Sequence, residues 1–215
     1  KIIKNTDFSK LYEDKLGLFS IGYNCSENKL IDSYYDLLAS EARQTSIIAI
    51  AKKDVPRKHW ASLGRTLTTV KGYKGLISWG GTAFEYLMPN LIIPTFESSL
   101  LDESCRLLGF AQKEYARKLG VPWGISESAF NLKDFYGNYQ YKTFGIPWLG
   151  LKRGLENEVV ISPYSVAISY KYDQNGIISN FNKLQDEGAR GKYGFYESID
   201  YIQNKKIVKT YMAHH

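Results

Sequence analysis

The 215-residue sequence has few cysteines and no long apolar run. Its two cysteines, Cys25 and Cys105, lack the CxxC or Cys/His spacing of a zinc site, and they form no disulfide framework. No stretch of about 18 apolar residues is present, and the N-terminal KIIKNTDFSK lacks the apolar segment of a signal peptide. We therefore expect no membrane span and no secretion signal in this chain, and a cytoplasmic location for it.

Motifs for nucleotide and nucleophile chemistry are also missing. The sequence contains no GxGxxG, P-loop, HExxH or GxSxG. Cys105 lies in an expected helix without a nearby histidine, which argues against a thiol nucleophile. The adjacent His214 and His215 point in different directions on any regular element, which argues against a pair of metal ligands. We therefore expect neither a metal nor a cofactor.

Charge and aromatic content point to different classes of partner. The net charge of +6 would permit nucleic-acid binding, but the basic residues are scattered and no run of five like charges occurs. The 17 tyrosines and 4 tryptophans are more informative, because their rings combine an apolar face with a polar group, as contact with sugars requires. A carbohydrate partner is therefore expected and a nucleic acid is not, although many of these rings are also suited to the edge of a core.

Helical periodicity dominates the expected regular structure. Apolar spacing, capping residues and terminators predict five helices. They cover residues 32–55, Thr82–Ile93 with an interruption at Pro89, Ser98–Leu119, Pro163–Tyr170 and Ile177–Glu187. The connections between them are long and rich in glycine and aromatic residues, so we expect short strands there and a site at one rim of a helical scaffold.

Three stretches place a carboxylate beside aromatic rings at a turn. They are SWGGTAFEYLMP with Glu85, PWGISESAF with Glu127, and YGFYESIDY with Glu197 and Asp200. Burial among rings raises the pKa of a carboxyl group, whereas polar neighbours keep another ionised, and glycoside cleavage uses one carboxyl group of each kind. For Glu85, the alternative is an acid in the first helical turn that favours the helix dipole.

A fourth stretch, YYDLLASEAR, adds Asp36, Glu41 and Arg43 on the long expected helix. An acid and a base so close in sequence could tune one another in a site. The alternative is an ordinary ion pair that holds the scaffold together.

The order of several segments resembles one family. The segments are LFSIGYN, SYYDLLASEAR, HWASLGR, SWGGTAFEYLMP, GVPWGISESAFN, YQYKTFGIPWLGLKRGL, SPYSVAIS, GKYGFYESIDY and YMAHH. They resemble the glucoamylase-like domain of cyclic β-1,2-glucan synthases and related bacterial proteins, from about residue 17 to the last residue. The resemblance implies a mainly α fold, an (α/α)6 toroid with short β elements in its active-site loops. Residues 1–215 are interpreted as a single catalytic domain of this type, incomplete at one or both ends.

The same resemblance implies a glycoside hydrolase or transglycosylase with an oligo- or polysaccharide substrate. It would hydrolyse β-linked glucose chains, β-1,2-linked in particular, or transfer and cyclise them through a pair of carboxylates. The alternative is a non-catalytic glycan-binding or scaffold fragment of a larger glucan synthase. The polymerising module of such synthases is membrane-bound and is not encoded here. The resemblance therefore implies that the parent protein is associated with the inner membrane.

Roles within the site follow from the same reading of the residues. Glu127 is interpreted as the ionised nucleophile or base, kept solvated by Ser126 and Ser128, and either Glu85 or Glu41 as the proton donor. The expected substrate-binding residues, some of which would tune the acids, are Asp36, Arg43, Trp79, Trp123, Tyr139, Gln140, Tyr141, Arg153, Tyr196 and Glu197. For each aromatic residue, packing between loops is the alternative.

Overall fold

The computed structural model describes residues 2–211, apart from the side chain of Ile3. Helices make up 35% and strands 24% of the residues that the structure describes. The expectation of a mainly α toroid is therefore wrong. The physical reason is that the glycine- and aromatic-rich connections pair with one another as short antiparallel strands, and so satisfy their backbone groups within small sheets.

The helices vary widely in length, and only three of those in residues 2–211 reach ten residues. The α-helices are α1 (Ile2–Asn5), α2 (Arg43–Lys52), α3 (Lys58–Ser62), α4 (Ala83–Leu87), α5 (Leu100–Leu119), α6 (Pro163–Ile168) and α7 (Gln174–Asp186). Three 3₁₀ turns accompany them, namely η1 (Phe8–Leu11), η2 (Met88–Leu91) and η3 (Leu155–Asn157).

The α5 helix confirms its sequence signals at both ends. Ser99 caps the N-terminus by accepting a hydrogen bond from Asp102 N, and Gly120 ends the helix in the left-handed conformation at φ 69°. Its buried face includes Leu107 and Leu108, both fully inaccessible, which lie in the centre of the main core. Burial of each leucine contributes about 2 kcal/mol relative to an exposed position.

The helix expected over residues 32–55 is correct only in its second half. The α2 helix begins at Arg43, whereas Tyr34–Tyr35 forms strand β5 and pairs with Phe19 and Ser20 of β2. Leu37 forms a parallel bridge with Gly64, and the chain then runs through bends and a turn before α2 begins. Aromatic residues favour strands, and pairing with a strand distant in sequence outweighs helical periodicity here.

The strands form small sheets rather than one large layer. The antiparallel pairings are β1 (Tyr12–Glu13) with β2 (Leu18–Ser20) and β2 with β5 (Tyr34–Tyr35); β3 (Tyr23–Asn24) with β4 (Lys29–Leu30); β6 (Leu67–Val70) with β7 (Tyr73–Leu76); β8 (Ser128–Lys133) with β9 (Tyr139–Lys142); and β12 (Gly194–Asp200) with β10 (Val160–Ile161), β11 (Arg190–Gly191) and β13 (Lys206–Tyr211).

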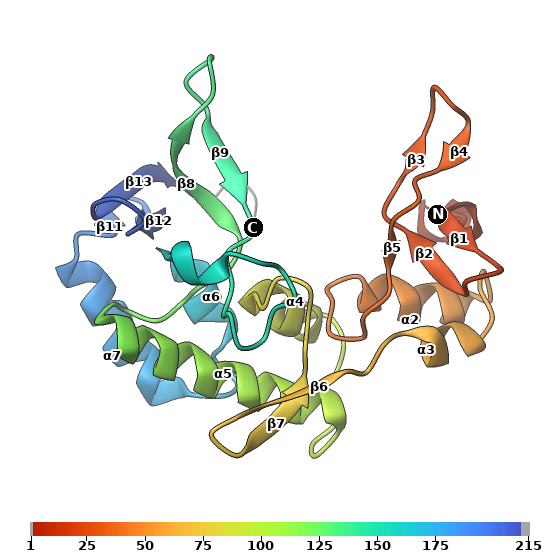
Figure 1. Ribbon diagram of the computed structural model, residues 1–215, viewed down its shortest axis with the longest axis horizontal. Coiled ribbons are helices and arrows are strands. Elements are labelled where there is room, and N and C mark those ends of the chain that lie inside the picture. Colours follow the sequence, from red (N-terminus) through yellow and green to blue (C-terminus); the bar gives the residue numbers. More distant parts are fainter. Residues whose placement is uncertain (1, 212–215) are drawn as a thin grey trace.

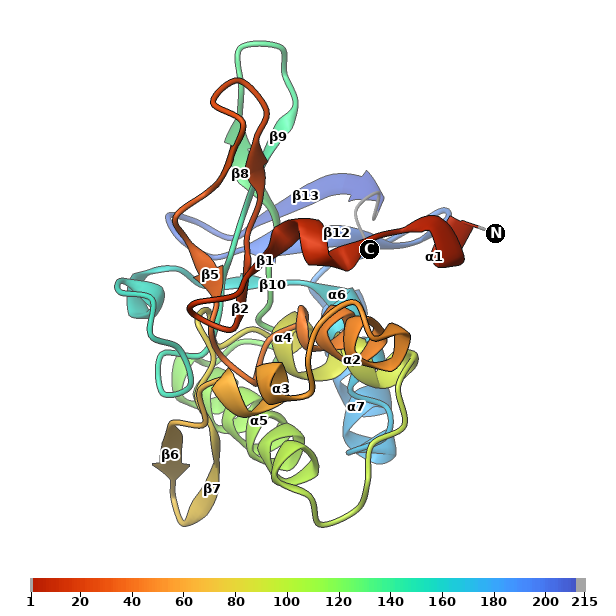
Figure 2. The same ribbon diagram turned by 90° about the vertical axis from the view of Figure 1, so that its right-hand side faces the viewer.

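Two hairpins rise on the same side of the molecule. Figure 1 shows β3–β4 and β8–β9 projecting upward at its two sides, while α5 crosses the lower part beneath α4. Figure 2, turned by 90°, shows both hairpins again pointing upward and β6–β7 pointing the opposite way.

A second small core, Tyr12, Phe19, Ala49 and Val55, belongs to the N-terminal sheet and α2. The space between this N-terminal part and the α4 and β8 region is where the expected acids lie.

Candidate active site

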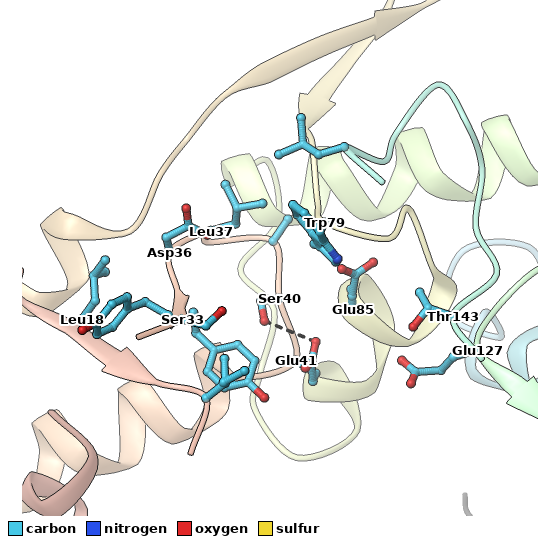
Figure 3. Close-up of a pocket in the computed structure, with 15 residues that line it drawn as sticks. Leu18, Ser33, Asp36, Leu37, Ser40, Glu41, Trp79, Glu85, Glu127 and Thr143 are labelled. Carbon is cyan, nitrogen blue, oxygen red and sulfur yellow. Dashed lines mark hydrogen bonds between the residues drawn. The ribbon is translucent and has the colours of Figure 1, made fainter. Parts of the chain in front are cut away.

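A cavity of about 610 Å³ is formed between the N-terminal sheet and the segments that precede α2, α4 and β8. Five of the sequence-predicted site residues line it, namely Asp36, Glu41, Trp79, Glu85 and Glu127. Figure 3 shows the carboxyl groups of Glu41, Glu85 and Glu127 around a common space, with Trp79 next to Glu85. Residues from distant parts of the chain are therefore gathered at one hollow.

Glu85 is held tightly by the turn that carries it. Thr82 and Glu85 form a capping box at the start of α4, in which Glu85 N donates to Thr82 Oγ1 (3.0 Å) and Thr82 N donates to Glu85 Oε2 (2.9 Å). Ser78 Oγ also donates to Oε2, and Gly80 N donates to Oε1, each at 2.8 Å. Burial raises the pKa of Glu85, and these hydrogen bonds oppose the rise. The contacts of Glu85 are therefore those of a helix-capping acid, which was the alternative interpretation.

The backbone that leads to Glu127 is held by side chains of other elements. Gln112 of α5 accepts from Ile125 N at 2.8 Å and donates to Ile125 O at 2.6 Å. Asn180 of α7 does the same for Trp123, at 3.0 and 2.7 Å. Each amide therefore satisfies both backbone groups of one residue, and together with the single bridge between Ile125 and Ile161 it fixes the chain.

The backbone at and beyond Glu127 is held in the same way. Tyr164 of α6 donates its hydroxyl hydrogen to Glu127 O at 3.0 Å. Ala129 N donates to Glu197 Oε1 at 3.1 Å, and Ser198 Oγ donates to Ala129 O at 2.5 Å. The main chain on both sides of Glu127 is thus anchored to α5, α6, α7 and β12, which leaves its carboxyl group directed into the cavity.

The Glu127 carboxyl group itself is only partly solvated. Burial raises its pKa to about 7, and the negative charges of Glu41 and Glu85 act in the same direction. Tyr141 opposes them by donating its hydroxyl hydrogen to Glu127 Oε2 at 3.2 Å. A carboxyl group with a pKa near neutrality can hold a proton where an ordinary glutamate has lost it.

The two serines beside Glu127 do not solvate it as the sequence suggested. Ser126 Oγ accepts a hydrogen bond from Phe84 N at 3.0 Å and donates its own hydroxyl hydrogen to Tyr164 Oη at 2.8 Å. Ser128 Oγ is buried and has no hydrogen-bond partner among the described residues. Both side chains point into the protein because the extended backbone alternates its side chains, so they face away from the carboxyl group between them.

Glu41 lies in the turn before α2 and is half-buried at the cavity wall. Its carboxyl group accepts a hydrogen bond from Ser40 Oγ at 3.2 Å. Glu41 and Glu85 both raise the pKa of Glu127, so the three groups are electrostatically coupled.

Residues 33–215 match the Glycoamylase family, which is described as "Putative glucoamylase". The chain belongs to the Glycoamylase family. This Glycoamylase chain is 43% identical, over 216 aligned positions, to the cyclic beta-(1,2)-glucan synthase NdvB of Rhizobium meliloti (strain 1021). The alignment covers 97% of the chain and 8% of NdvB, so the chain spans a small part of this relative. The resemblance stated from the sequence is confirmed.

Solved structures share the fold. The endo-beta-1,2-glucanase from Chitinophaga pinensis, in complex with sophorotriose and glucose, matches with a TM-score of 0.68 at 17% identity. A second structure, from Bacteroides caccae ATCC 43185, matches with a TM-score of 0.70, also at 17% identity. Both matches cover 95% of the Glycoamylase chain and 52% of the other chain, so the chain spans about half of each.

Arg43 of the Glycoamylase chain lies beneath the site rather than in it. Its side chain is buried, and its guanidinium group donates to the carbonyl oxygens of Ser40, Glu85 and Tyr86. Arg43 therefore does not line the cavity, and its expected contact with a substrate stays a prediction. Its position at the start of α2 turns it toward α4 instead of toward the cavity.

Four other expected substrate contacts lie away from the cavity lining. Trp123 belongs to the main core, where the extended backbone turns its ring inward. Tyr139 and Gln140 are on β9 of the projecting hairpin, and Tyr139 packs its ring against Lys133 Nζ at 4.5 Å. Arg153 is exposed beyond Leu151. The expected substrate contacts of these four residues stay predictions.

Three expected residues are near the site without lining the cavity. Tyr141 reaches Glu127 directly. Glu197 is fully buried behind β8, and its Oε2 has no hydrogen-bond partner among the described residues. Tyr196 packs against Tyr211 with ring centroids 5.1 Å apart, on the side of β12 away from Glu197. Of the three, Tyr141 alone touches a carboxyl group of the cavity, Glu197 supports β8 behind it, and Tyr196 contacts Tyr211 instead.

Sequence reasoning missed much of the N-terminal wall. The lining residues that it did not single out are Leu18, Ile21, Ser33, Tyr34, Tyr35, Leu37, Ala39, Ser40, Thr143 and Leu151. The segment SYYDLL is part of one of the segments that carry the family resemblance, and it could have indicated that Tyr34 and Tyr35 lie at the site. It was assigned to a helix, and the tyrosines were therefore not placed at a site.

The described part of the chain shows no metal-ion cluster and no membrane-crossing helix. Within residues 2–211, no three His, Cys, Asp or Glu side chains are grouped as ligands, and no helix combines the length and apolarity needed to cross a bilayer. The pair His214 and His215 lies outside the described residues.

Proposed function

We propose that this Glycoamylase chain carries the carboxylate site of a carbohydrate-active domain that cleaves or transfers β-linked glucan, with β-1,2 linkages as the preferred substrate. The names of NdvB and of the Chitinophaga pinensis glucanase both refer to β-1,2-linked glucan, which supports this linkage. The observation that carries the proposal is the carboxyl group of Glu127, which faces Glu41 and Glu85 across one cavity. The chain would form one part of a larger catalytic domain.

Glu127 is the proposed general acid. Its pKa of about 7 keeps a large fraction protonated at neutral pH, and its backbone is anchored on both sides. A general acid works best when its pKa lies near the working pH, because it must hold a proton and still release it to the leaving oxygen. The sequence interpretation gave Glu127 the other role, that of the ionised nucleophile or base.

Glu41 is the proposed second carboxylate, acting as nucleophile or base. Glu85 is the competing choice, but Gly80 N, Thr82 N and Ser78 Oγ occupy its oxygens. A carboxylate whose lone pairs hold a turn together has little capacity to attack a sugar or a water. Glu41 is half-buried at the cavity wall and carries one hydrogen bond from the adjacent Ser40, so it fits this role better.

Aromatic side chains at the cavity provide surfaces for sugar rings. Trp79 is 61% exposed and Tyr35 is 37% exposed, and both line the cavity, so their ring faces are open to a ligand there. Their backbones are fixed: Tyr35 pairs with Phe19, and Trp79 O accepts from Lys152 N at 2.9 Å. We assign Trp79 and Tyr35 as stacking platforms for the glucan.

The experiment incubates the chain with linear β-1,2-glucan and follows products and their anomeric configuration by NMR. Glu127→Gln and Glu41→Gln should each reduce turnover at least about 100-fold. Glu156→Gln, an exposed glutamate in η3 outside the cavity, is the matched control and should leave turnover unchanged. Wild-type turnover by Glu127→Gln would contradict the proposal.

A second substrate separates the two roles. An aryl β-glucoside with an acidic phenol as leaving group needs little protonation to depart. Glu127→Gln should therefore keep most of its activity on this substrate, whereas Glu41→Gln should remain inactive. The reverse pattern would exchange the two assignments.

The non-catalytic alternative rests on one observation, that the chain spans about half of the solved structures it matches. It predicts that β-1,2-glucan binds and shields the Trp79 ring from a fluorescence quencher, while the glucan itself is neither cleaved nor transferred. A Trp79→Ala variant should then lose binding while Trp60→Ala, remote from the cavity lining, does not.

A further inference from the structure

Arg43 is a buried cation whose hydrogen bonds go to uncharged oxygens. The side chain is 3% exposed. In the described structure its guanidinium group donates to three carbonyl oxygens, and more weakly to Asn90 Oδ1 at 3.4 Å. Burial of an ion away from a counter-ion costs several kcal/mol. Burial accordingly lowers the pKa of Arg43. A role in packing alone would be served at lower cost by an apolar side chain of similar size.

The three carbonyl groups belong to the two segments that carry Glu41 and Glu85. Arg43 Nη1 donates to Ser40 O at 2.9 Å and to Glu85 O at 2.5 Å, and Nη2 donates to Tyr86 O at 2.5 Å. Ser40 is bonded to Glu41 in the chain and also donates its hydroxyl hydrogen to the Glu41 carboxylate. One guanidinium group thus joins the turn before α2 to the α4 helix directly below the cavity.

We propose that Arg43 is a positioning residue that fixes the Glu41 turn against α4 and thereby holds Glu41 opposite Glu127. The planar fork of arginine reaches carbonyl groups on both segments at once, which the single ammonium group of lysine does not. The consequence for catalysis rests on the proposed function, but the positioning itself is independent of it.

A titration of Glu127 tests the position of Glu41 without using activity. Carbon-13 NMR of labelled glutamate carboxyl groups reports the midpoint of Glu127, which is about 7 in the intact chain. The titratable groups that face Glu127 are Glu41, Glu85, Tyr35 and Tyr141, with Tyr164 and Glu197 behind it. Because the charge of Glu41 raises this pKa, a Glu41 that has moved away lowers the midpoint.

Arg43→Met removes the fork and keeps a long side chain in the core. We expect the Glu127 midpoint to fall by at least about half a unit, as Glu41 moves away. Loss of the positive charge alone acts in the opposite direction, because a removed cation raises a carboxyl pKa. A fall therefore reports movement of Glu41, and an unchanged or raised midpoint would overturn the proposal.

Two further variants complete the test. Glu41→Gln should lower the midpoint by itself, and adding Arg43→Met to it should cause no further fall, since both changes remove the same charge from the site. Arg43→Lys should give a smaller fall than Arg43→Met. Additive shifts in the double variant would contradict the proposal.

Arg65→Met is the matched control. Arg65 also donates to carbonyl oxygens, those of Leu63 and Trp60, but it is exposed and lies outside the cavity lining. Its loss should leave the midpoint of Glu127 unchanged. If both Arg43 variants fail to fold, the proposal is overturned in favour of a general role in the core. Glucan turnover by Glu127→Gln would refute the proposed function and leave the titration result standing.

Discussion

Glu85 and Glu127 each follow a Trp-Gly pair in the sequence and line the same cavity, yet they are held in opposite ways. At Glu85 the side chain is fixed, because the turn donates hydrogen bonds to both of its oxygens. At Glu127 the main chain is fixed by Tyr164 and the flanking contacts, while the carboxyl group is left to Tyr141 and the cavity. Fixing the backbone of an acid preserves its chemistry, and fixing its oxygens converts it into a structural element.

Close glycine packing on the Glu85 side should give the largest effect. A methyl group at Gly145 would lie 1.7 Å from Gly80 O, a backbone atom that has no free space to move. Gly80 N is the donor to Glu85 Oε1, so Gly145→Ala should displace the turn and cost at least about 4 kcal/mol of unfolding free energy. Urea unfolding measures this.

Gly109→Ala is the control for that change. Gly109 lies inside α5 with nothing within 4 Å of an added methyl group. The substitution should stabilise the protein by about 0.5–1 kcal/mol, because alanine favours a helix over glycine. Equal effects at Gly145 and Gly109 would remove the claim that the Glu85 turn depends on close backbone contact.

Glu85→Gln tests the structural side of the comparison directly. Whichever way the amide turns, its NH₂ group replaces an acceptor that faces Gly80 N or Thr82 N. We expect a loss of about 3 kcal/mol, since hydrogen bonds to a buried charged acceptor are strong. Glu103→Gln, in the first turn of α5 and exposed, should cost less than about 1 kcal/mol. A neutral Glu85→Gln in urea unfolding would show that the turn does not need its acid.

Glu127→Gln should have the opposite sign. The pKa of Glu127 is raised from 4.5 to about 7, so between these values the folded protein holds a proton that the unfolded chain has lost. Stability therefore falls as the pH rises through this window, and the loss is complete above about pH 7. Glutamine removes the loss and should stabilise the protein by up to about 3 kcal/mol at pH 8. The unfolding curves of the wild type and of Glu127→Gln should agree at pH 4 and differ at pH 8.

Tyr141→Phe should give the smallest effect and sharpens the Glu127 side. The Tyr141 hydroxyl group stabilises the ionised carboxylate, so its removal should raise the Glu127 midpoint by less than about one unit. Tyr139→Phe, on the same strand with its ring at Lys133, should leave the midpoint unchanged. Carboxyl NMR distinguishes these outcomes, and a midpoint that falls in Tyr141→Phe would show that the hydrogen bond favours the neutral acid instead.

Local signals were sufficient where neighbours in sequence decide the structure. The ends of α5 follow from Ser99 and Gly120, and the break after α4 follows from Pro89, because caps and missing donors act within one helical turn. Glu85 was correctly seen as a candidate for the first turn of a helix for the same reason. The carboxylate-bearing stretches of the sequence singled out Glu41, Glu85 and Glu127, which line one cavity, although they did not give the environments of these acids.

Local signals failed where distant segments decide. Tyr35 carries a helical pattern but pairs with Phe19, and this contact has no counterpart in the local sequence. Trp79 and Trp123 share a Trp-Gly context, yet one is 61% exposed at the cavity and the other is buried in the core. Which of the two rings lines the cavity depends on what packs against each from elsewhere in the chain.

The sequence by itself determined the local elements and the residue types available for chemistry, since caps, turns and terminators depend on near neighbours. Only the tertiary structure decided which carboxyl group keeps its oxygens free and which loses them to a turn. The reason is that burial and proton affinity are set by all groups that surround a side chain. At Glu127 those groups come from α5, α6, α7, β9 and the turn before α2.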